Sequence, residues 1–523
     1  MAPRSKPTPS AQAVRWWKSR ADTDRYVVSP HESPSDAVTR VLRQKKLILE
    51  VAGRCAWILA DPQRTDDRAA FLANFWPVVA LTMEKYAPAA IDGVAAVRLH
   101  LEDFSVPVTL GALHHASASN YNLTLHDEFV LQLRPTLRRR ATIAVVTGPS
   151  DARIPVLAPC DLLLTLDESE VTAGIESVAA WLRHLVVRTP DLERAVERYP
   201  RPVVLHRLAD IAKEVGNAPL ARMLDASAKH VSARFSSPSR TGVGTRIIVP
   251  AALRDMAAGE GSAWEDEQRA RLERQTRDVA TIVGGVETNS SKTARRAQLN
   301  FARQAKAYDT YHNTTLEGYK IPRSLSDAIV NGDPLPAGQS EETIRAAMAV
   351  QGYSGAFDLV LELARQDGKI TRAVILDLYE ALFRPSVDAG IVDAGGLRSW
   401  RTSNVSLRGW RHVPPNHRKL RDLLVGLELY ATRTNVERAV RAFVIHLEFV
   451  TIHPFLDGNG RLGRLLLNLE LLRGGLPWVT VREDERIPFF RAIERAQVDG
   501  DCSDYAKFLW LAVQNARRDM ASA

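Results

Sequence analysis

The chain has 523 residues, of which 45% are hydrophobic, 25% charged and 7% aromatic, which is typical of a soluble globular protein of two or three domains. The formal net charge of +8 and the pI near 9.4 favour acidic partners, nucleic acid among them, without deciding for one. There is no apolar run of transmembrane length and no secretory segment, so we expect no association with a membrane. The three scattered cysteines, Cys55, Cys160 and Cys502, show no metal-binding spacing and predict a cytoplasmic protein.

The first part of the chain changes character several times. Residues 1–36 are rich in Pro, Ser and charge, and we expect a mostly disordered lead there. Residues 37–235 are predicted to form a mixed α/β accessory domain, because helical and strand patterns alternate along them. The helical patterns cover residues 36–59, 67–85, 171–187, 191–199 and 203–226, and the strand patterns cover 106–110, 130–133, 143–146 and 162–166.

Three consecutive arginines, Arg138 to Arg140, flank the predicted strands. They could bind the phosphates of DNA, because Lys and Arg on nucleic acid displace counterions. The alternative, which the pattern favours, is that the charges protect an exposed strand edge from pairing. Nucleic-acid binding by the accessory domain therefore stays an open alternative.

The second part of the chain is predicted to be almost entirely helical, so the fold class is mainly α. A Ser-, Gly- and Pro-rich stretch, residues 235–245, predicts a linker, and residues 236–294 are assigned to linker and connecting helix. Residues 295–515 follow as an all-α domain. Its apolar periodicity predicts helices over 295–316, 341–351, 355–366, 371–383, 417–431, 435–452, 462–472, 487–498 and 503–515.

One stretch between two of these helices, residues 453–464, has the composition of a binding loop. Pro454 ends the first helix, and Gly458 and Gly460 let consecutive N–H groups point into one small space. Such N–H groups at the start of a helix bind anions, because the helix dipole adds partial positive charge. The sequence therefore predicts an anion site at the start of the second helix.

Charged and titratable side chains near this anion site could take part in a reaction. Arg461 and Arg464 add two permanent cations, and Asp457 offers carboxylate oxygens of the kind that hold Mg²⁺ beside phosphates. The imidazole of histidine titrates near neutral pH, so His453 can accept a proton. Together these groups predict transfer of a phosphorus group from a nucleotide.

Residues 453–464 match every fixed position of HPFx(D/N)GNGRxxR, so the region 295–515 resembles the Fic family. The resemblance implies transfer of AMP from ATP, with Mg²⁺, to a Ser, Thr or Tyr hydroxyl of a target protein. It implies His453 as the base and Asp457 as the metal ligand. The implied ATP contacts are Gly458, Asn459, Gly460, Arg461, Arg464 and Asn468. For Asn468 a solvent-facing or capping role is the alternative.

Two further segments resemble Fic elements. Asn313 to Gly318 resembles the inhibitory motif (S/T)xxxE(G/N), which implies that Glu317 pairs with Arg464 and blocks productive ATP binding. Asn313 departs from the expected Ser or Thr. An alternating segment before Pro414 and Pro415 predicts a short strand of a β-hairpin flap, which implies docking of the target by strand addition. Its docking residues are Asn404, Val405, Ser406 and Leu407, and an unrelated surface hairpin is the alternative.

Two other functions remain as alternatives. The same scaffold could transfer UMP, phosphocholine or phosphate, although the intact Gly458-Asn459-Gly460 sequence favours AMP. A DNA-binding regulator could use the Fic part as a nucleotide sensor. The sequence does not identify the target protein or the oligomeric state, for which a homodimer is one possibility. It also leaves open whether Glu317 acts within one chain or across two.

Overall fold

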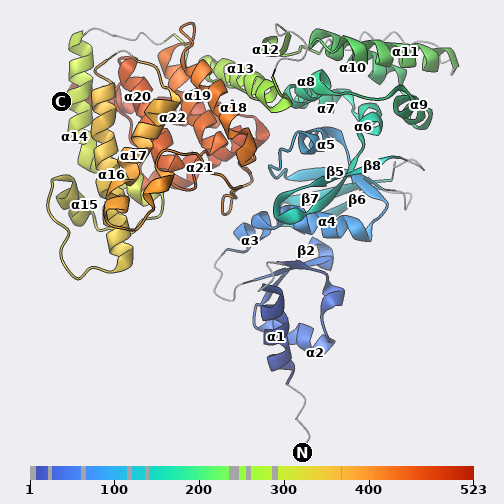
Figure 1. Ribbon diagram of the computed structural model, residues 1–523, viewed down its shortest axis with the longest axis horizontal. Helices are drawn as coiled ribbons and strands as arrows, with labels where there is room; N and C mark the ends of the chain where they lie inside the picture. The colour runs from blue at the N-terminus through green and yellow to red at the C-terminus, as the bar shows by residue number, and fades with distance from the viewer. Residues whose placement is uncertain are drawn as a thin grey trace, which may run out of the picture. The chain divides into compact units, whose positions relative to one another are not determined.

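The computed structural model divides the chain into two units (Figure 1). The N-terminal unit comprises residues 1–267 and 406–413, and the C-terminal unit comprises residues 268–405 and 414–523. The predicted linker 235–245 and Arg138 to Arg140 lie outside the residues that the structure describes. The described residues are 8–21, 26–60, 66–114, 120–135, 141–234, 247–254, 261–285, 292–366 and 368–522.

The N-terminal unit begins with a small folded module, residues 9–59, which we call the terminal module. The prediction of a mostly disordered lead is wrong for it, because its first helix buries Ala13 and Trp16 in a local core. The predicted helix over 36–59 is also wrong beyond Gln44, since the β-branched and apolar residues that follow form a hairpin. The elements are α1 (Pro9–Ala21), β1 (Val27–Val28), η1 (Pro30–Glu32), α2 (Asp36–Gln44), β2 (Ile48–Val51), η2 (Ala52–Arg54) and β3 (Ala56–Leu59).

A six-stranded mixed sheet forms the middle of this unit, in the order β6-β7-β5-β4-β9-β8. Two pairs, β4 with β9 and β5 with β7, are parallel, and the others are antiparallel. The strands predicted over 130–133 and 143–146 are confirmed, whereas the strand near residue 106 begins later, at Thr109. The strands are β4 (Ala89–Ile91), β5 (Thr109–His114), β6 (Tyr121–His126), β7 (Phe129–Arg134), β8 (Ile143–Thr147) and β9 (Arg153–Leu157).

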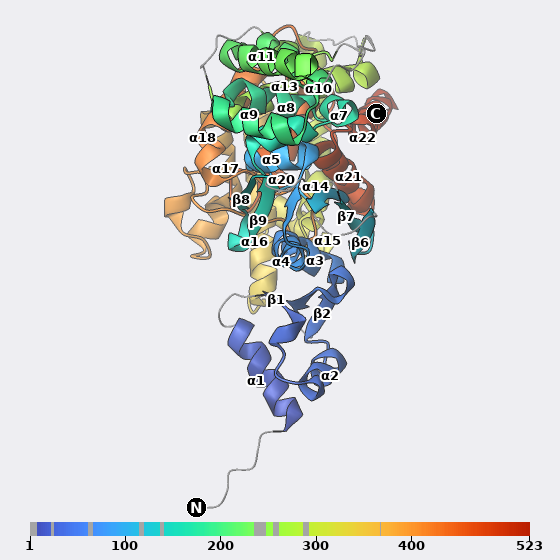
Figure 2. The ribbon, with the colours of Figure 1, turned by 90° about the vertical axis from the view of Figure 1, so that its right-hand side faces the viewer.

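Helices complete the N-terminal unit, so the predicted mixed α/β character is confirmed (Figure 2). The strand predicted over 162–166 is wrong: this apolar run belongs to a helix that starts at Pro159, and a short buried run does not distinguish strand from helix. The helices are α3 (Asp67–Ala73), α4 (Phe75–Lys85), α5 (Gly93–His100), α6 (Pro159–Thr165), α7 (Glu168–Ala173), α8 (Ile175–His184), α9 (Thr189–Arg198), α10 (Pro202–Glu214), α11 (Ala218–Arg234) and α12 (Ala251–Arg254).

The C-terminal unit is all-α over its described residues, as predicted. The helices expected over 341–351 and 355–366 are one helix, α16, which continues through Gly352 because the absent side chain there admits the backbone carbonyl of Leu382. The chain enters this unit within α13 (Ala263–Val283). The helices that follow are α14 (Lys292–Leu316), α15 (Arg323–Val330), α16 (Glu341–Leu363), α17 (Arg372–Asp388), α18 (Leu420–Ala431), α19 (Arg438–Ile452), α20 (Asn459–Arg473), α21 (Arg486–Glu494) and α22 (Ser503–Ser522).

The segment expected to form a β-hairpin flap contains no strand over residues 401–416. Residues 406–413, which we call the inserted segment, instead pack within the N-terminal unit. The N–H of Val106 donates to the Arg411 carbonyl at 2.7 Å, and Arg411 Nε donates to the Val106 carbonyl at 3.0 Å. The flap prediction fails because part of the segment bonds to a distant part of the chain, and not to a neighbouring strand.

Two simpler expectations can be compared with the described residues. None of their helices is both long enough and apolar enough to cross a membrane. Cys55, Cys160 and Cys502 are buried free thiols, as the scattered spacing predicts.

Candidate active site

His453 occupies the end of α19 in a conformation that fixes its ring. Its backbone is left-handed, with φ 52° and ψ 59°, and its N–H donates to the Phe449 carbonyl at 3.0 Å. Nδ1 lies 3.3 Å from the carbonyl of Val450. Because a carbonyl can only accept, Nδ1 carries the proton in this contact and the lone pair lies on Nε2. This is the tautomer that a general base requires.

The loop after His453 is held by the side chain of Asn459. Asn459 Nδ2 donates to the Phe455 carbonyl at 2.9 Å, and the Phe455 N–H donates back to Asn459 Oδ1 at 3.0 Å. The Phe455 ring is buried and stacks on Tyr379 at 3.6 Å between centroids. The sequence analysis assigned Asn459 to the ATP phosphates, but its side chain closes the loop, which leaves its backbone N–H as the group that can face an anion.

The start of α20 has the anion-binding geometry that the two glycines predict. Gly458 has φ +82°, and the first bond within the helix runs from the Leu462 N–H to the Gly458 carbonyl at 2.9 Å. The N–H groups of the intervening residues are therefore those that a helix leaves without an internal acceptor. With the helix dipole behind them, they favour a phosphate oxygen at this position.

Arg461 and Asp457 lie together at this helix start. Arg461 is 1% exposed, its guanidinium lies over the rings of Tyr319 and Phe383, and its Nη2 is 3.3 Å from Asp457 Oδ2. Its buried Nε has no hydrogen-bond partner among the described residues. A cation held in this way over aromatic rings, with an N–H to spare, suits a ligand that brings negative charge.

The residues present also fit a bound Mg²⁺. The Asp457 side chain is 61% exposed, so its carboxylate is accessible to an ion. No group of three or more His, Cys, Asp or Glu side chains suited to a metal is found in the part of the chain that the structure describes. A single carboxylate suits Mg²⁺, which takes most of its remaining oxygens from water and substrate phosphates.

Arg464 is paired with the carboxylate that the sequence analysis chose for it. Arg464 Nη2 donates to Glu317 Oε1 at 2.6 Å and to the Asn313 carbonyl at 3.3 Å, and Nε donates to Asn313 Oδ1. Burial raises the pKa of Glu317, but the charges of Arg464 and Arg461 outweigh it and hold the pKa below its usual value. Asn313, the departure from the motif, thus supplies two contacts of its own.

Glu317 also covers the start of α20. A Cβ placed on Gly460 would overlap Glu317 Oε1 and lie 3.2 Å from Arg464 Nη1. That Nη1 is buried and has no hydrogen-bond partner among the described residues. The Glu317 carboxylate therefore lies where the helix start and Arg464 together favour an anion.

Arg401 is a residue of the site that sequence reasoning missed. It is 5% exposed, and its side chain donates to the carbonyls of His453, Ser403 and Pro415 at 2.9, 2.8 and 2.6 Å. Its backbone N–H donates to the Pro454 carbonyl at 2.9 Å. Burial lowers the pKa of Arg401 to about 10. A single arginine in a polar segment carries no periodic signal that could have identified it.

Asn468 does not have the geometry expected of an ATP contact. Its Nδ2 donates to the carbonyls of Arg464 and Val479 at 3.1 and 3.0 Å, and its Oδ1 accepts from the Val479 N–H at 2.8 Å. Both amide hydrogens are therefore engaged within the protein. The structure assigns Asn468 to holding the chain beyond α20, which corrects the predicted nucleotide contact.

A buried carboxylate, Asp309, lies two helical turns before Glu317 on α14. It is fully buried and accepts hydrogen bonds from Tyr353 and Thr480 at 2.9 and 2.6 Å. Burial raises the pKa of Asp309 to about 6. Asp309, Asn313 and Glu317 are spaced by four residues, so they lie on one side of α14 and of the turn that follows it.

Comparison with known proteins agrees with this geometry, because residues 369–471 match the Fic/DOC family. The chain carries a Fic domain. The match includes the loop 453–464 and most of α20, and is shorter than the predicted range 295–515. The Fic domain is thus recognised by the part of the chain that holds the candidate catalytic residues.

Relatives of the Fic domain include named enzymes. Protein adenylyltransferase fic-1 of Caenorhabditis elegans is 28% identical over 203 residues, which are 38% of each chain. Protein adenylyltransferase Fic of Drosophila ananassae is 25% identical over 430 residues, 80% of this chain and 78% of that protein. The solved structure of Fic-1 from C. elegans aligns with TM-score 0.37 and 18% identity over 67% of this chain and 92% of that one. The chain thus spans little more than a third of the worm relative.

Proposed function

We propose that the protein is an adenylyltransferase that moves AMP from ATP to a Ser, Thr or Tyr hydroxyl of a target protein. The observation that carries the proposal is the contact of His453 Nδ1 with the Val450 carbonyl, which leaves Nε2 to accept a proton, beside the helix start that also holds Arg461. The names of the relatives support the same reaction. The unpaired thiols favour the cytoplasm as its setting.

In this mechanism His453 Nε2 accepts the proton of the target hydroxyl. The hydroxyl oxygen forms a bond to the α-phosphorus of ATP, and the bond from that phosphorus to the bridging oxygen breaks to release pyrophosphate. The N–H groups at the start of α20 and the Arg461 guanidinium stabilise the negative charge on the phosphates. Asp457 would hold Mg²⁺, which when bound neutralises phosphate charge.

The proposal includes repression by Glu317. Its carboxylate lies against Gly460 and pairs with Arg464, so it occupies the anion position that the distal phosphate of ATP needs. Because the pKa of Glu317 is lowered, this ion pair is present at neutral pH and is lost only as the pH falls through that lowered pKa. Departure of the Glu317 side chain would then open the site to productive ATP binding.

We further propose that Asn404, Val405, Ser406 and Leu407 dock the target. These residues have no regular secondary structure and alternate between exposed and half-buried side chains. A segment without regular secondary structure can still pair with a target strand by main-chain hydrogen bonds. The docking role therefore does not require the hairpin that the sequence analysis expected.

The test is transfer of label from [α-³²P]ATP, with the product measured by mass spectrometry as an added AMP. His453→Ala should lower the transfer rate roughly 10²- to 10⁴-fold, the usual contribution of a general base. Nucleotide binding should persist, because the imidazole does not hold the phosphates. Near-normal transfer by this variant would refute the proposed role, and Arg418→Ala, an exposed change nearby, serves as the control.

A further inference from the structure

The terminal module has the connectivity of a winged helix-turn-helix. Its order is a helix, a strand, a helical turn, a second helix and a two-stranded hairpin, and the sheet order is β1-β3-β2 with antiparallel pairs. The helical turn η1 and the helix α2 are separated by three residues, 33–35. A short turn of this length between two helical elements defines the helix-turn-helix, whose second helix reads DNA.

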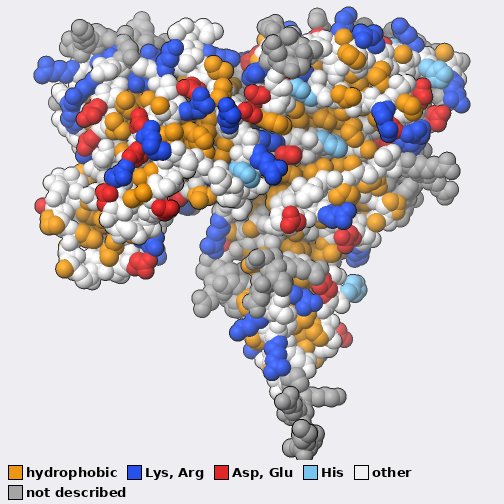
Figure 3. Space-filling model, in the orientation of Figure 1, with side chains coloured by type: hydrophobic (Ala, Val, Ile, Leu, Met, Phe, Trp, Pro, Cys, Tyr) orange, Lys and Arg blue, Asp and Glu red, His pale blue; other side chains and the backbone are white. Residues whose placement is uncertain are grey.

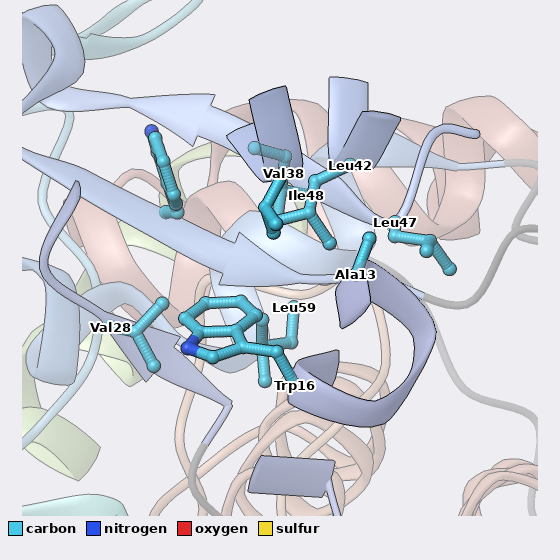
Figure 4. Close-up of a cluster of buried hydrophobic side chains, with 9 residues drawn as sticks. Ala13, Trp16, Val28, Val38, Leu42, Leu47, Ile48 and Leu59 are labelled. Carbon is cyan, nitrogen blue, oxygen red and sulfur yellow. The ribbon is translucent and has the colours of Figure 1, made fainter. Parts of the chain in front are cut away.

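A core of its own holds α2 in a fixed orientation. Val38 and Leu42 on its inner face pack with Trp16 of α1 and with residues of the sheet (Figure 4). The Trp16 indole N–H donates to the Glu32 carbonyl at 3.0 Å, which ties α1 to the turn before α2. Ser35 caps α2 by accepting from the Val38 N–H. These contacts therefore fix the orientation of α2 within the terminal module.

The opposite face of α2 is polar and exposed. The exposed residues of the helix recur at the spacing of one helical face, and they are Asp36, Ala37, Arg40, Arg43 and Gln44. Figures 1 and 2 both show α1 and α2 at the end of the N-terminal unit that is remote from α8 to α11. The outer face of α2 is thus accessible within this unit.

Positive charge is concentrated in this part of the sequence. Residues 1–59 hold eleven Lys and Arg against five Asp and Glu, a net +6 of the chain's +8. Exposed cations lie on α2 and directly after it, at Arg40, Lys45 and Lys46, and Arg43 is paired with Glu50 at 2.7 Å. Lys and Arg side chains are visible on the surface of the module (Figure 3). Such a local excess of cations is the electrostatic signature of a nucleic-acid-binding element.

The hairpin tip is not available for the same purpose. A Cβ on Gly53, at the tip, would lie 3.0 Å from the Leu123 side chain of β6, so the tip packs against the large sheet. Lys85 Nζ of α4 contacts Cys55 Sγ at 3.3 Å on the same side. The element left to contact a ligand is therefore α2 with the lysines that follow it.

We propose that the terminal module binds duplex DNA, with α2 in the major groove. An α-helix with its side chains is about 10–12 Å across, which matches the roughly 12 Å width of the B-form major groove. Arg40 and Gln44 face the bases, because they lie on the exposed face of the helix. Lys45 and Lys46 contact the phosphate backbone beside the groove. This binding is independent of the nucleotide chemistry of the Fic domain.

The experiment uses the full chain and a fluorescein-labelled 30-base-pair DNA duplex of mixed sequence, followed by anisotropy at several salt concentrations. The wild type should bind, with affinity that falls steeply as salt rises. The double variant Arg40→Ala, Lys45→Ala should bind roughly 10- to 100-fold more weakly and flatten the log–log salt slope by about 2. AMP transfer should be unchanged.

A matched variant and a second probe make the result decisive. Arg222→Ala with Lys229→Ala removes one exposed arginine and one exposed lysine from α11, and should leave DNA binding within about twofold of the wild type. Equal losses in both variants, or no binding by the wild type at low salt, would overturn the proposal. Equal binding of an A-form RNA duplex would overturn the major-groove geometry, because that groove is too deep and narrow in RNA.

Discussion

His453 lies at the end of α19, and Asn459 and Arg461 lie in the first turn of α20, yet their side chains contact different groups. His453 Nδ1 contacts the Val450 carbonyl, Asn459 closes the loop on Phe455, and Arg461 lies buried over two aromatic rings. The motif predicts which residues gather, because its spacing fixes the loop. It does not predict which side chain the loop itself engages, since that depends on distances within the fold.

Arg401 provides the first residue-scale prediction. Arg401→Lys removes the planar fork that reaches the carbonyls of His453, Ser403 and Pro415. We expect kcat for AMP transfer to fall by about 10²-fold, because a misplacement of about 1 Å at the reacting groups costs that much. The KM for ATP should change little, since the phosphate contacts remain.

The conservative change Arg418→Lys, on an exposed side chain of the same region, should leave both constants unaltered. A rise in KM with unchanged kcat would show that Arg401 serves nucleotide binding, and not the position of His453.

Asp309 leads to a pH-dependent prediction. Its pKa is about 6 in the folded protein, against a usual 3.8, because burial disfavours the charged form. Between these values the folded state keeps a proton that the unfolded chain has released, so the free energy of unfolding falls as the pH rises. Asp309→Asn should remove this loss, so the stability of the variant relative to the wild type should rise by on the order of 3 kcal/mol between about pH 4 and neutral pH.

Urea unfolding of both proteins at the two pH values measures the difference. An advantage of the variant that stays the same at both pH values would mean that Asp309 does not titrate in this range.

At the scale of elements, helix α14 and the turn that follows it carry the contacts to Arg464 on a single face. Asn313 holds Arg464 through its side chain and its carbonyl, and Glu317 holds the same guanidinium one turn later. Helix α14 ends at Leu316, and Gly318, with φ +90°, lies in the turn directly after Glu317. The end of the helix therefore fixes the position of Glu317 relative to the start of α20.

The Glu317 prediction compares two substitutions. Glu317→Gly removes both the charge and the bulk over Gly460, and self-modification with AMP should rise roughly 5- to 150-fold, the usual range of coupling between sites. Glu317→Gln keeps the bulk and removes the charge, so it should give a smaller rise. Mass spectrometry of the protein after incubation with ATP measures both.

Adding His453→Ala to Glu317→Gly should abolish the gain. An unchanged rate in the Glu317→Gly variant would remove the inhibitory role and leave the transferase proposal in place.

Whether an element can be predicted depends on whether the interactions that form it are local in the sequence. Long helices such as α14 and α19 are predictable, because their apolar period is set within the segment itself. The elements of the terminal module are not predictable in this way, because the short helix and the hairpin in residues 36–59 have the same composition as one long helix. The packing of the inserted segment also could not be predicted, because Val106, the partner of Arg411, lies some 300 residues away.

At the scale of the whole molecule, composition predicts two kinds of domain but not the exact residue at which the chain divides. The compact units divide within α13, between Glu267 and Gln268, inside the residues 236–294 that were assigned to linker and connecting helix. Helix α13 is charged along its length, and no local signal marks the change. The net charge is likewise a poor guide as a single number, because residues 1–59 hold most of it.

The inserted segment means that the polypeptide passes between the two units three times: after residues 267, 405 and 413. Neither unit is therefore formed by one continuous stretch of the sequence. A recombinant fragment that starts at Gln268 would carry eight residues stripped of their Val106 partner, and a fragment that stops at Glu267 would lack them altogether. Exchange of the N-terminal unit between related proteins, in the laboratory or in evolution, has to replace both pieces together.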